Sequence, residues 1–214
     1  GRDIEIPESC PFCHAPVEER GALLFCTNKD DCKPQLIYAL DHFASREGMD
    51  IVGLSERTIR QLMDELDVRK PSDLYALKQE QLSVLEGFGE KKAQNLVDSI
   101  EKSKTRSLAA YIFALGIPNI GKATAGDLAK KYESIDALAQ AGQEELLQIR
   151  DIGSIVADGI VQYFAAPENQ KELETLKAYG IDPKNRPMER ADQSGLLQGK
   201  TVVFTGTLNS MSRT

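Results

Sequence analysis

The sequence contains no long hydrophobic run and no recognisable leader. Its longest apolar stretch, from Leu108 to Ile117, is too short to cross a bilayer, which takes about 20 residues. No basic segment followed by an apolar one opens the chain, so a secretory signal peptide is not expected. We therefore expect no interaction with a membrane.

An excess of positive charge is also lacking. The chain has 33 acidic and 26 basic residues, with a net charge of −7. Because DNA affinity comes mostly from lysine and arginine, this balance on its own argues against a nucleic-acid partner, and the local distribution of charge has to decide. The hydrophobic content of 41% and the charged content of 28% are those of an ordinary globular protein.

Cysteine is absent from the chain except between Cys10 and Cys32, where all four cysteines lie. The pair in Cys10-Pro-Phe-Cys13 can hold a metal ion from a tight turn, and Cys26 and Cys32 can complete a tetrahedron, although their spacing is wider than usual. Four thiolates leave no open position, which predicts a structural zinc site. Two disulfides are the alternative, and they require an oxidising compartment that nothing here indicates. We expect His14 to be an exposed neighbour and not a ligand.

Beyond the cysteines, the chain is an internal repeat. Four segments align on Ser55, Gly89, Gly121 and Gly153, at separations of 34, 32 and 32 residues. In all four, the positions one and four before the anchor and four, seven, eight and eleven after it are apolar. These columns are Leu54, Phe88, Ile120 and Ile152; Ile51, Leu85, Ile117 and Ile149; Ile59, Ala93, Ala125 and Ala157; Leu62, Leu96, Leu128 and Ile160; Met63, Val97, Ala129 and Val161; and Leu66, Ile100, Tyr132 and Phe164.

Each repeat is expected to be a helix, a tight turn and a second helix. The steps of three and four after each anchor form one buried helical stripe. A shorter apolar-periodic piece precedes each anchor, such as Leu74, Leu77, Leu82 and Leu85. Units of this kind with a period in the low thirties are typical of helical repeats, so we expect a mainly α fold.

One repeat contains Gly116-x-x-x-x-Gly121-Lys122, one residue short of a P-loop. A P-loop follows a strand and has Ser or Thr after the lysine to hold magnesium. Here the preceding apolar residues have helical spacing and Ala123 occupies the magnesium position, so we reject a nucleotide-binding loop. We also reject a dinucleotide fingerprint at Gly87-Phe88-Gly89, because Lys92 stands at its third glycine position.

The turns are better suited to a different phosphate ligand. A glycine just before a helix can take positive φ and leaves room for a ligand, and the first amides of the following helix are unpaired at its positive end. Together they form an anion site made of backbone. A row of such sites suits a polymer of phosphates better than one nucleotide. The alternative is a helical repeat that only packs.

Several segments carry a family resemblance. The turns "LEGFGEKKAQNL", "LGIPNIGKATAGDL" and "IRDIGSIVADGI" resemble helix-hairpin-helix motifs, which bind DNA backbones through hairpin amides. Four copies behind a four-cysteine module resemble the C-terminal half of bacterial NAD-dependent DNA ligases, as do "HFASREGMDIVGLSERTI" and "LYALKQEQLSVLEGFGEKKAQNL". "GRDIEIP" is similar to the end of an OB-fold domain and "LLQGKTVVFTG" to the opening strand of a BRCT domain.

The resemblance implies a division of the chain into modules. Residues 1–9 would end an OB-fold domain, 10–35 form a four-cysteine zinc finger, and 36–182 form a helix-hairpin-helix domain with its four hairpins paired two by two. A linker at 183–195 and an incomplete BRCT start at 196–214 would follow, in which Thr205-Gly206 is expected to be a strand end more than a phosphate contact. Because the chain begins with Gly and stops after one expected strand, we expect a fragment of a longer protein.

The resemblance also implies a function. The chain would bind nicked double-stranded DNA without reading its sequence, as part of a bacterial ligase. That ligase would be a monomer, cytoplasmic and nucleoid-associated, and would join a 3′-hydroxyl to a 5′-phosphate in replication and repair. In that family a Lys-x-Asp-Gly lysine upstream takes AMP from NAD, with Mg as a further cofactor, and this motif is absent here. We therefore expect no catalysis and zinc as the only cofactor of this part. The residues implied to contact DNA are Gly53, Ser55, Gly87, Phe88, Gly89, Lys91, Lys92, Asn119, Ile120, Gly121, Lys122, Gly153 and Ser154.

The sequence departs from the family's hairpin pattern in two ways, and three other classes of protein are alternatives to a ligase. Ser55 replaces the key glycine of the first repeat, which is expected to be a packing copy. Asn119 and Asp151 stand where the second repeat has Gly87, and the fourth repeat is expected to bind weakly.

A helix-hairpin-helix glycosylase would need a Gly-Pro-Asp sequence, which is absent. A junction-binding hairpin protein would lack the cysteine module and the BRCT start, and a protein-interaction scaffold would show no salt-dependent DNA binding.

The basic residues are concentrated in one segment, although the net charge of the chain is negative. From Gly87 to Lys131 there are eight basic and four acidic residues, whereas from Tyr132 to Asp182 there are three basic and ten acidic ones. We expect a polarised domain in which the second and third hairpins hold phosphates. The alternative is a set of solvated helix faces without a partner.

Overall fold

The computed structural model describes residues 7–21 and 23–185, and this part is mainly helical, as expected. The BRCT start, most of the expected linker and the beginning of the OB-fold end lie outside the described residues. The elements are β1 (Val17–Arg20), β2 (Leu23–Cys26), α1 (Lys33–Ala44), α2 (Glu56–Leu66), α3 (Pro71–Tyr75), α4 (Gln79–Ser83), α5 (Glu90–Ser103), α6 (Leu108–Ala114), α7 (Lys122–Lys131), α8 (Ile135–Ala139), α9 (Gln143–Leu146), α10 (Ser154–Ala165) and α11 (Pro167–Ala178).

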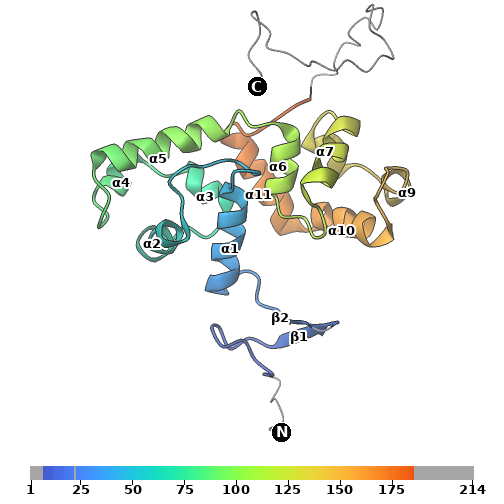
Figure 1. Cartoon of the computed structure of the whole chain (residues 1–214), viewed down its shortest axis with the longest axis horizontal. Helices are drawn as coiled ribbons and strands as arrows, with labels where there is room; N and C mark the ends of the chain where they lie inside the picture. The colour runs from blue at the N-terminus through green and yellow to red at the C-terminus, as the bar shows by residue number, and fades with distance from the viewer. Residues whose placement is uncertain (1–6, 22, 186–214) are drawn as a thin grey trace, which may run out of the picture.

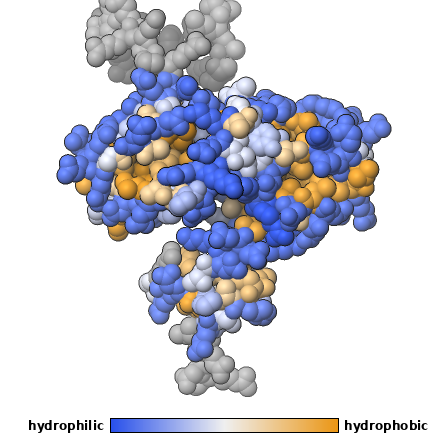
Figure 2. Space-filling view, turned by 180° about the vertical axis from the view of Figure 1, so that it is seen from behind, coloured by the Kyte–Doolittle hydropathy of each residue, from blue (hydrophilic) through white to orange (hydrophobic). Residues whose placement is uncertain are grey.

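The cysteine segment forms a small module that extends away from the helical body, below α1 (Figure 1). Its strands β1 and β2 pair antiparallel, with Val17 opposite Cys26. The hairpin buries little: the side chains of Phe12, Leu23 and Phe25 are 71%, 63% and 42% exposed. Figure 2 shows hydrophobic surface on this lower module. A module with so small a core needs another source of stability, since apolar burial contributes only in proportion to the area removed from water.

The repeated apolar columns form the core of the helical body. The residue just before each anchor and those four and seven after it are buried in all four repeats, which confirms the predicted stripe. Leu66, Val97 and Ile149 are half-buried and Val161 is 38% exposed, so the stripe is less complete at its edges. The apolar residue of each turn, which is Leu54, Phe88, Ile120 or Ile152, therefore holds its hairpin against the core.

The first helix of a repeat is not uniform. The piece from Leu74 to Leu85 is two short helices, α3 and α4, instead of one. Lys78 between them has extended backbone, and its N–H donates to the side chain of Gln81 at 3.1 Å, which begins α4 afresh. The fourth repeat is built in the same way from α8 and α9.

Hydrogen bonds and close packing join the hairpins in pairs. In the first pair, the Val52 amide donates to Ser99 Oγ of α5 at 2.7 Å, and Gln61 of α2 donates to the Glu86 carbonyl in the second hairpin at 2.9 Å. In the second pair, a Cβ placed on Gly159 of α10 would lie 3.6 Å from the Pro118 carbonyl of the third hairpin. The pairing expected from the resemblance is thus visible in the contacts.

The last helix, α11, closes the body. Glu172 accepts hydrogen bonds from the amide and the hydroxyl of Ser72 in α3, at 2.7 and 2.8 Å, across about a hundred residues of chain. Helix α11 therefore fastens the end of the second pair to the first.

The beginning of the expected linker still contacts the body, because the backbone N–H of Asn185 donates to the Glu133 carbonyl at 2.9 Å. None of the helices formed by residues 7–21 and 23–185 has the length and apolarity needed to span a membrane.

Candidate nucleic-acid interface and cysteine cluster

The four cysteines come together at the junction between the hairpin and α1. Cys10 and Cys13 lie in the turn before β1, Cys26 ends β2, and Cys32 is the N-cap of α1. Their sulfurs all lie within 4.8 Å of one another, with Cys10–Cys32 at 3.9 Å and Cys13–Cys26 at 3.4 Å. All four are free thiols, so the disulfide alternative does not describe this structure. His14 is exposed and is not one of the clustered ligands, as expected.

The cluster has the size of a tetrahedral metal site. Zinc–sulfur bonds of about 2.3 Å correspond to sulfur–sulfur edges of about 3.8 Å in a tetrahedron, which is close to the Cys10–Cys32 separation of 3.9 Å. Hydrogen bonds with the backbone of Cys13 and Phe12 lower the pKa of Cys10 to about 7. Desolvation raises the pKa of Cys26 to about 12 and also raises that of Cys32. Burial thus disfavours the thiolates of Cys26 and Cys32, and a cation bound among the four sulfurs would offset this cost.

The four turns share one backbone geometry. The residue two before each anchor is left-handed: Gly53 and Gly87 have φ of 94° and 72°, and Asn119 and Asp151 both have φ of 63°. Asn and Asp adopt this conformation more readily than other non-glycine residues, which is why they replace glycine there. The departures at Asn119 and Asp151 thus leave the turn intact.

The expectation of positive φ at the glycine just before the helix is wrong. Gly89, Gly121 and Gly153 are N-caps with φ of −110°, −89° and −88° and extended ψ, a conformation open to any residue. A Cβ at any of the three would meet nothing within 4 Å. A need for positive φ therefore does not explain the glycine at these three positions. The lack of a side chain, which leaves the end of the helix uncovered, does explain it.

The glycine caps leave helix amides exposed. In α5, α7 and α10 the first intrahelical bond is donated by the fourth residue after the anchor, at 3.0, 2.9 and 3.0 Å. Within the described residues, the three amides before it donate to no protein acceptor, and the glycine supplies no side-chain cap. Each of these helix ends can therefore accept an anion.

The first repeat differs from the other three in its cap. Ser55 caps α2, and its hydroxyl accepts from the Thr58 amide at 3.3 Å. One of the amides that an anion would use is thus already paired. The turn amide of Val52 is also taken, by Ser99.

The candidate DNA-contacting residues divide into a surface group and a buried group. The exposed ones are Gly53, Ser55, Gly87, Gly89, Lys91, Lys92, Asn119, Gly121, Lys122, Gly153 and Ser154. Phe88 and Ile120 are buried, so their side chains pack in the core and only their backbone lies in the turn. Lys92 is engaged within its own hairpin: its ammonium lies 3.8 Å from the Phe88 ring centroid and donates to the Gly87 carbonyl at 3.3 Å.

The fourth hairpin carries features that disfavour an anion. The carboxylate of Asp151 is 80% exposed in the turn, 3.6 Å from Arg150. Ile155, in the first turn of α10, is 74% exposed and occupies the position that Lys91 holds in the second repeat. Ile155 was not among the residues predicted from the sequence, although the alignment of the repeats shows the replacement.

Two segments of the chain match known helix-hairpin-helix families. Residues 47–102 match the family described as a SAM-like helix-hairpin-helix tandem, and residues 110–173 match the family described as a helix-hairpin-helix motif. The chain contains tandem helix-hairpin-helix domains. The two matched ranges coincide with the two pairs of hairpins seen in the fold.

Similarity to DNA ligases covers nearly the whole chain. It is 46% identical over 212 residues to a DNA ligase of Clostridium novyi (strain NT) and 48% identical over 211 residues to a DNA ligase of Alkaliphilus oremlandii (strain OhILAs), in both cases over 99% of the chain. It is 44% identical over 212 residues to DNA ligase 2 of Clostridium acetobutylicum. The resemblance to DNA ligases is confirmed. The chain spans about a third of the length of these relatives, 32% of the first two.

Proposed function

We propose that this chain binds double-stranded DNA through its backbone phosphates without reading the base sequence. The observation that carries the proposal is the set of three glycine-capped helix ends, in α5, α7 and α10, whose first amides are exposed and unpaired in the described structure. Such ends bind anions through backbone groups that make no contact with base edges. The similarity to DNA ligases supports DNA as the source of the phosphates.

Within this proposal the hairpins contribute unequally. The second and third hairpins lie in the basic half of the domain and carry Gly87, Gly89, Lys91, Asn119, Gly121 and Lys122. The fourth hairpin, with Gly153 and Ser154, contributes less because Asp151 repels a phosphate there. Gly53 and Ser55 of the first hairpin serve mainly in packing. Lys92 supports the second hairpin from within.

We also propose a place for the chain in a larger protein. It is the non-catalytic DNA-binding part of an NAD-dependent ligase that seals nicks in replication and repair, while NAD and Mg bind elsewhere in that protein. The absence of a Lys-x-Asp-Gly motif from the sequence supports this division. Incubation with labelled NAD or ATP should leave the chain unlabelled, and an AMP adduct on any of its lysines would overturn the division. The protein is proposed to be a monomer at the bacterial nucleoid.

Zinc is the proposed ion for Cys10, Cys13, Cys26 and Cys32. A set of four thiolates at tetrahedral separations, with no neighbouring carboxylate or His in the cluster, suits zinc among the common divalent ions. The ion would have a structural role, because the four sulfurs leave no position for a substrate or a water. Elemental analysis of the purified protein should find one zinc per chain.

The central experiment is a salt titration of DNA binding. Fluorescence anisotropy should show binding to labelled duplexes of unrelated sequence with similar affinity, and log affinity should fall linearly with log salt, by roughly 0.9 for each phosphate neutralised. A nicked and an intact duplex of the same sequence measure any preference for the nick. Binding that is absent, or that does not depend on salt, would favour a protein-interaction scaffold.

A further inference from the structure

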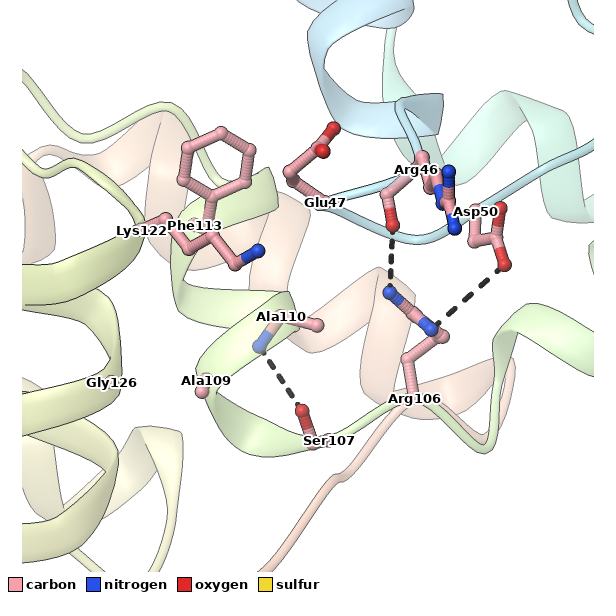
Figure 3. A pocket seen from close by; sticks show the side chains of 10 residues that line it. All are labelled: Arg46, Glu47, Asp50, Arg106, Ser107, Ala109, Ala110, Phe113, Lys122 and Gly126. Atoms are coloured by element: carbon pink, nitrogen blue, oxygen red, sulfur yellow. Dashed lines mark hydrogen bonds and ion pairs between the residues drawn. The ribbon is translucent and has the colours of Figure 1, made fainter. Parts of the chain in front are cut away.

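A polar hollow of about 570 Å³ lies at the junction between the two hairpin pairs. Its polar lining comes from the loop after α1 (Arg46, Glu47 and Asp50), from the start of α6 (Arg106 and Ser107) and from the first residue of α7 (Lys122). Figure 3 shows Lys122 and Glu47 on one side and Arg46, Asp50 and Arg106 on the other. The hollow therefore uses residues of both pairs.

Arg106 fastens this junction. Its guanidinium donates to the Gly48 carbonyl at 3.0 Å and to the Arg46 carbonyl at 2.9 Å, and lies 3.9 Å from the Asp50 carboxylate. The loop it holds is already tight, since a Cβ on Gly48 would lie 2.7 Å from the Phe43 carbonyl. The charge and donors of Arg106 are thus used inside the protein, and they fix the backbone that carries Arg46.

Two other cations in the hollow are not used in this way. Arg46 and Lys122 are exposed, and within residues 7–21 and 23–185 neither side chain forms an ion pair or a hydrogen bond. Two carboxylates also line the hollow, that of the exposed Glu47 and that of Asp50, which lies 3.9 Å from Arg106. Because Asp50 lies beside Arg106, the remaining charges are two positive against one negative.

We propose that this hollow binds a phosphodiester of the DNA backbone, held between Arg46 and Lys122 at the seam of the two hairpin pairs. The inference rests on the proposed DNA binding and adds a phosphate contact outside the hairpin turns. Lys122 is the first residue of α7, so the hollow adjoins the helix end at which the third hairpin offers its amides. A DNA strand on that helix end would bring its next phosphates to the hollow. Arg106 acts as a positioning residue.

The test is a salt titration of duplex binding by four single variants and one double variant. Arg46→Gln and Lys122→Gln should each weaken binding roughly tenfold at low salt, as expected for a lost charge-assisted contact, and lower the salt slope by about 0.9. Glu47→Gln, which removes the opposing charge, should tighten binding. Lys29→Gln is the matched control, because Lys29 precedes α1, whose 12 residues span about 18 Å. It should bind like the parent.

The double variant Arg46→Gln/Lys122→Gln tests whether one phosphate is shared. Two side chains on one ligand are coupled, so the double variant should lose less affinity than the product of the two single losses. A full product would show separate contacts and overturn the shared site. Circular dichroism should be unchanged, since neither side chain has a partner to lose among the residues that the structure describes.

Failure of the inference and failure of the proposed function give different results. If the parent does not bind duplex DNA, the proposed function is wrong. If the parent binds with a salt-dependent affinity and the Arg46 variant has the same slope, only the hollow has been misassigned. Inorganic phosphate at equal ionic strength should displace DNA no better than chloride. Displacement by phosphate that disappears in Arg46→Gln would assign the hollow to a free anion instead and overturn the proposal.

Discussion

At the scale of single residues, the N-cap separates the hairpins that expose amides from the one that does not. Ser55 and Gly121 occupy the same position and the same extended backbone, with φ of −80° and −89°. The serine hydroxyl takes the Thr58 amide, whereas the glycine leaves the corresponding amides of α7 open. The choice of one small residue thus decides whether a helix end is available to a ligand.

This difference predicts the outcome of exchanging the two caps. Gly121→Ser should fold normally, because φ is negative and the space is open, and its stability should change by only a few tenths of a kcal/mol. DNA binding should weaken, since the hydroxyl would compete for the Thr124 amide. Anisotropy titration and thermal denaturation measure the two effects. Ser55→Gly is the reciprocal variant and should not weaken binding; a Gly121→Ser protein that binds like the parent would remove the helix end from the interface.

Neighbouring lysines in the second hairpin are predicted to behave differently. Among the described residues, the Lys91 ammonium forms no hydrogen bond or ion pair that would compete with a phosphate, whereas Lys92 lies over Phe88 and donates to Gly87. Lys91→Gln should lower the salt slope by about 0.9. Lys92→Gln should lower thermal stability and affinity while leaving the slope unchanged. Equal slopes for the two variants, both below that of the parent, would contradict the supporting role of Lys92.

The positions of the four hairpin turns were predictable from the sequence, but their conformation was not. The burial of Leu54, Phe88, Ile120 and Ile152, the apolar residues of the four turns, could be predicted because apolar spacing indicates which side chains are buried. Which residue of the turn has positive φ was not identifiable, since glycine occurs both where φ requires it and where a ligand requires space. Asn119 and Asp151 become informative only once their φ values are known.

At the scale of elements, the cysteine module and the helical body are stabilised by different means. The strands β1 and β2 leave Leu23 and Leu24 63% and 40% exposed, so the hairpin has little core of its own. Helix α1 belongs to both parts: Cys32 caps it, while Leu40 and Phe43 are fully buried in the body. The four sulfurs therefore have to hold the hairpin onto a helix that is already stable.

Removal of the metal is accordingly predicted to affect one part only. Chelation or thiol modification should release one ion per chain and expose residues 7–32 to proteolysis, because binding of a structural metal is coupled to folding of its loop. Helical circular dichroism should remain nearly unchanged, since α1 keeps its packing. Cys13→Ser should reproduce the loss, and His14→Asn, beside the cluster but outside it, should not. Loss of most of the helical signal on chelation would contradict this division.

Element boundaries were less predictable than element types. The helices after each anchor were expected from four repeated columns, and α2, α5, α7 and α10 confirm them. The splitting of the Leu74 to Leu85 piece was not expected, because its leucines keep a helical spacing across the break at Lys78. Backbone hydrogen bonding by Gln81 decides this break, and a hydrophobic pattern carries no information about it. The hollow was also not predictable, since Arg46 and Lys122 come from different repeats.

At the scale of the whole molecule, charge differs between the segment that contains the turns of the second and third hairpins and the segment that contains the fourth hairpin. Seen from behind, hydrophobic areas in both halves of the helical body are separated by a hydrophilic strip (Figure 2). Between Tyr132 and Asp182 acidic residues outnumber basic ones by ten to three, and from Gly87 to Lys131 basic ones prevail by eight to four. A DNA duplex would therefore be held more strongly along the second and third hairpins than along the fourth, despite a net charge of −7.

The polarity predicts different results for two double variants that remove the same charge. Lys91→Gln/Lys122→Gln takes two cations from the basic half and should lower the salt slope of duplex binding by about 1.8. Arg150→Gln/Lys171→Gln takes two cations from the acidic half and should leave the slope unchanged. Asp151→Asn should tighten binding slightly with its fold intact, because Asn119 adopts the same left-handed conformation in the third turn.

These variants are best compared on one nicked duplex, with circular dichroism to confirm folding. Net charge changes equally in both double variants, so a general effect of charge would lower both slopes alike. A selective loss in the first variant therefore reports where phosphates lie and not how acidic the protein is. If instead the Arg150→Gln/Lys171→Gln protein loses its salt dependence while the Lys91→Gln/Lys122→Gln protein keeps it, DNA lies along the fourth hairpin and the polarity is reversed.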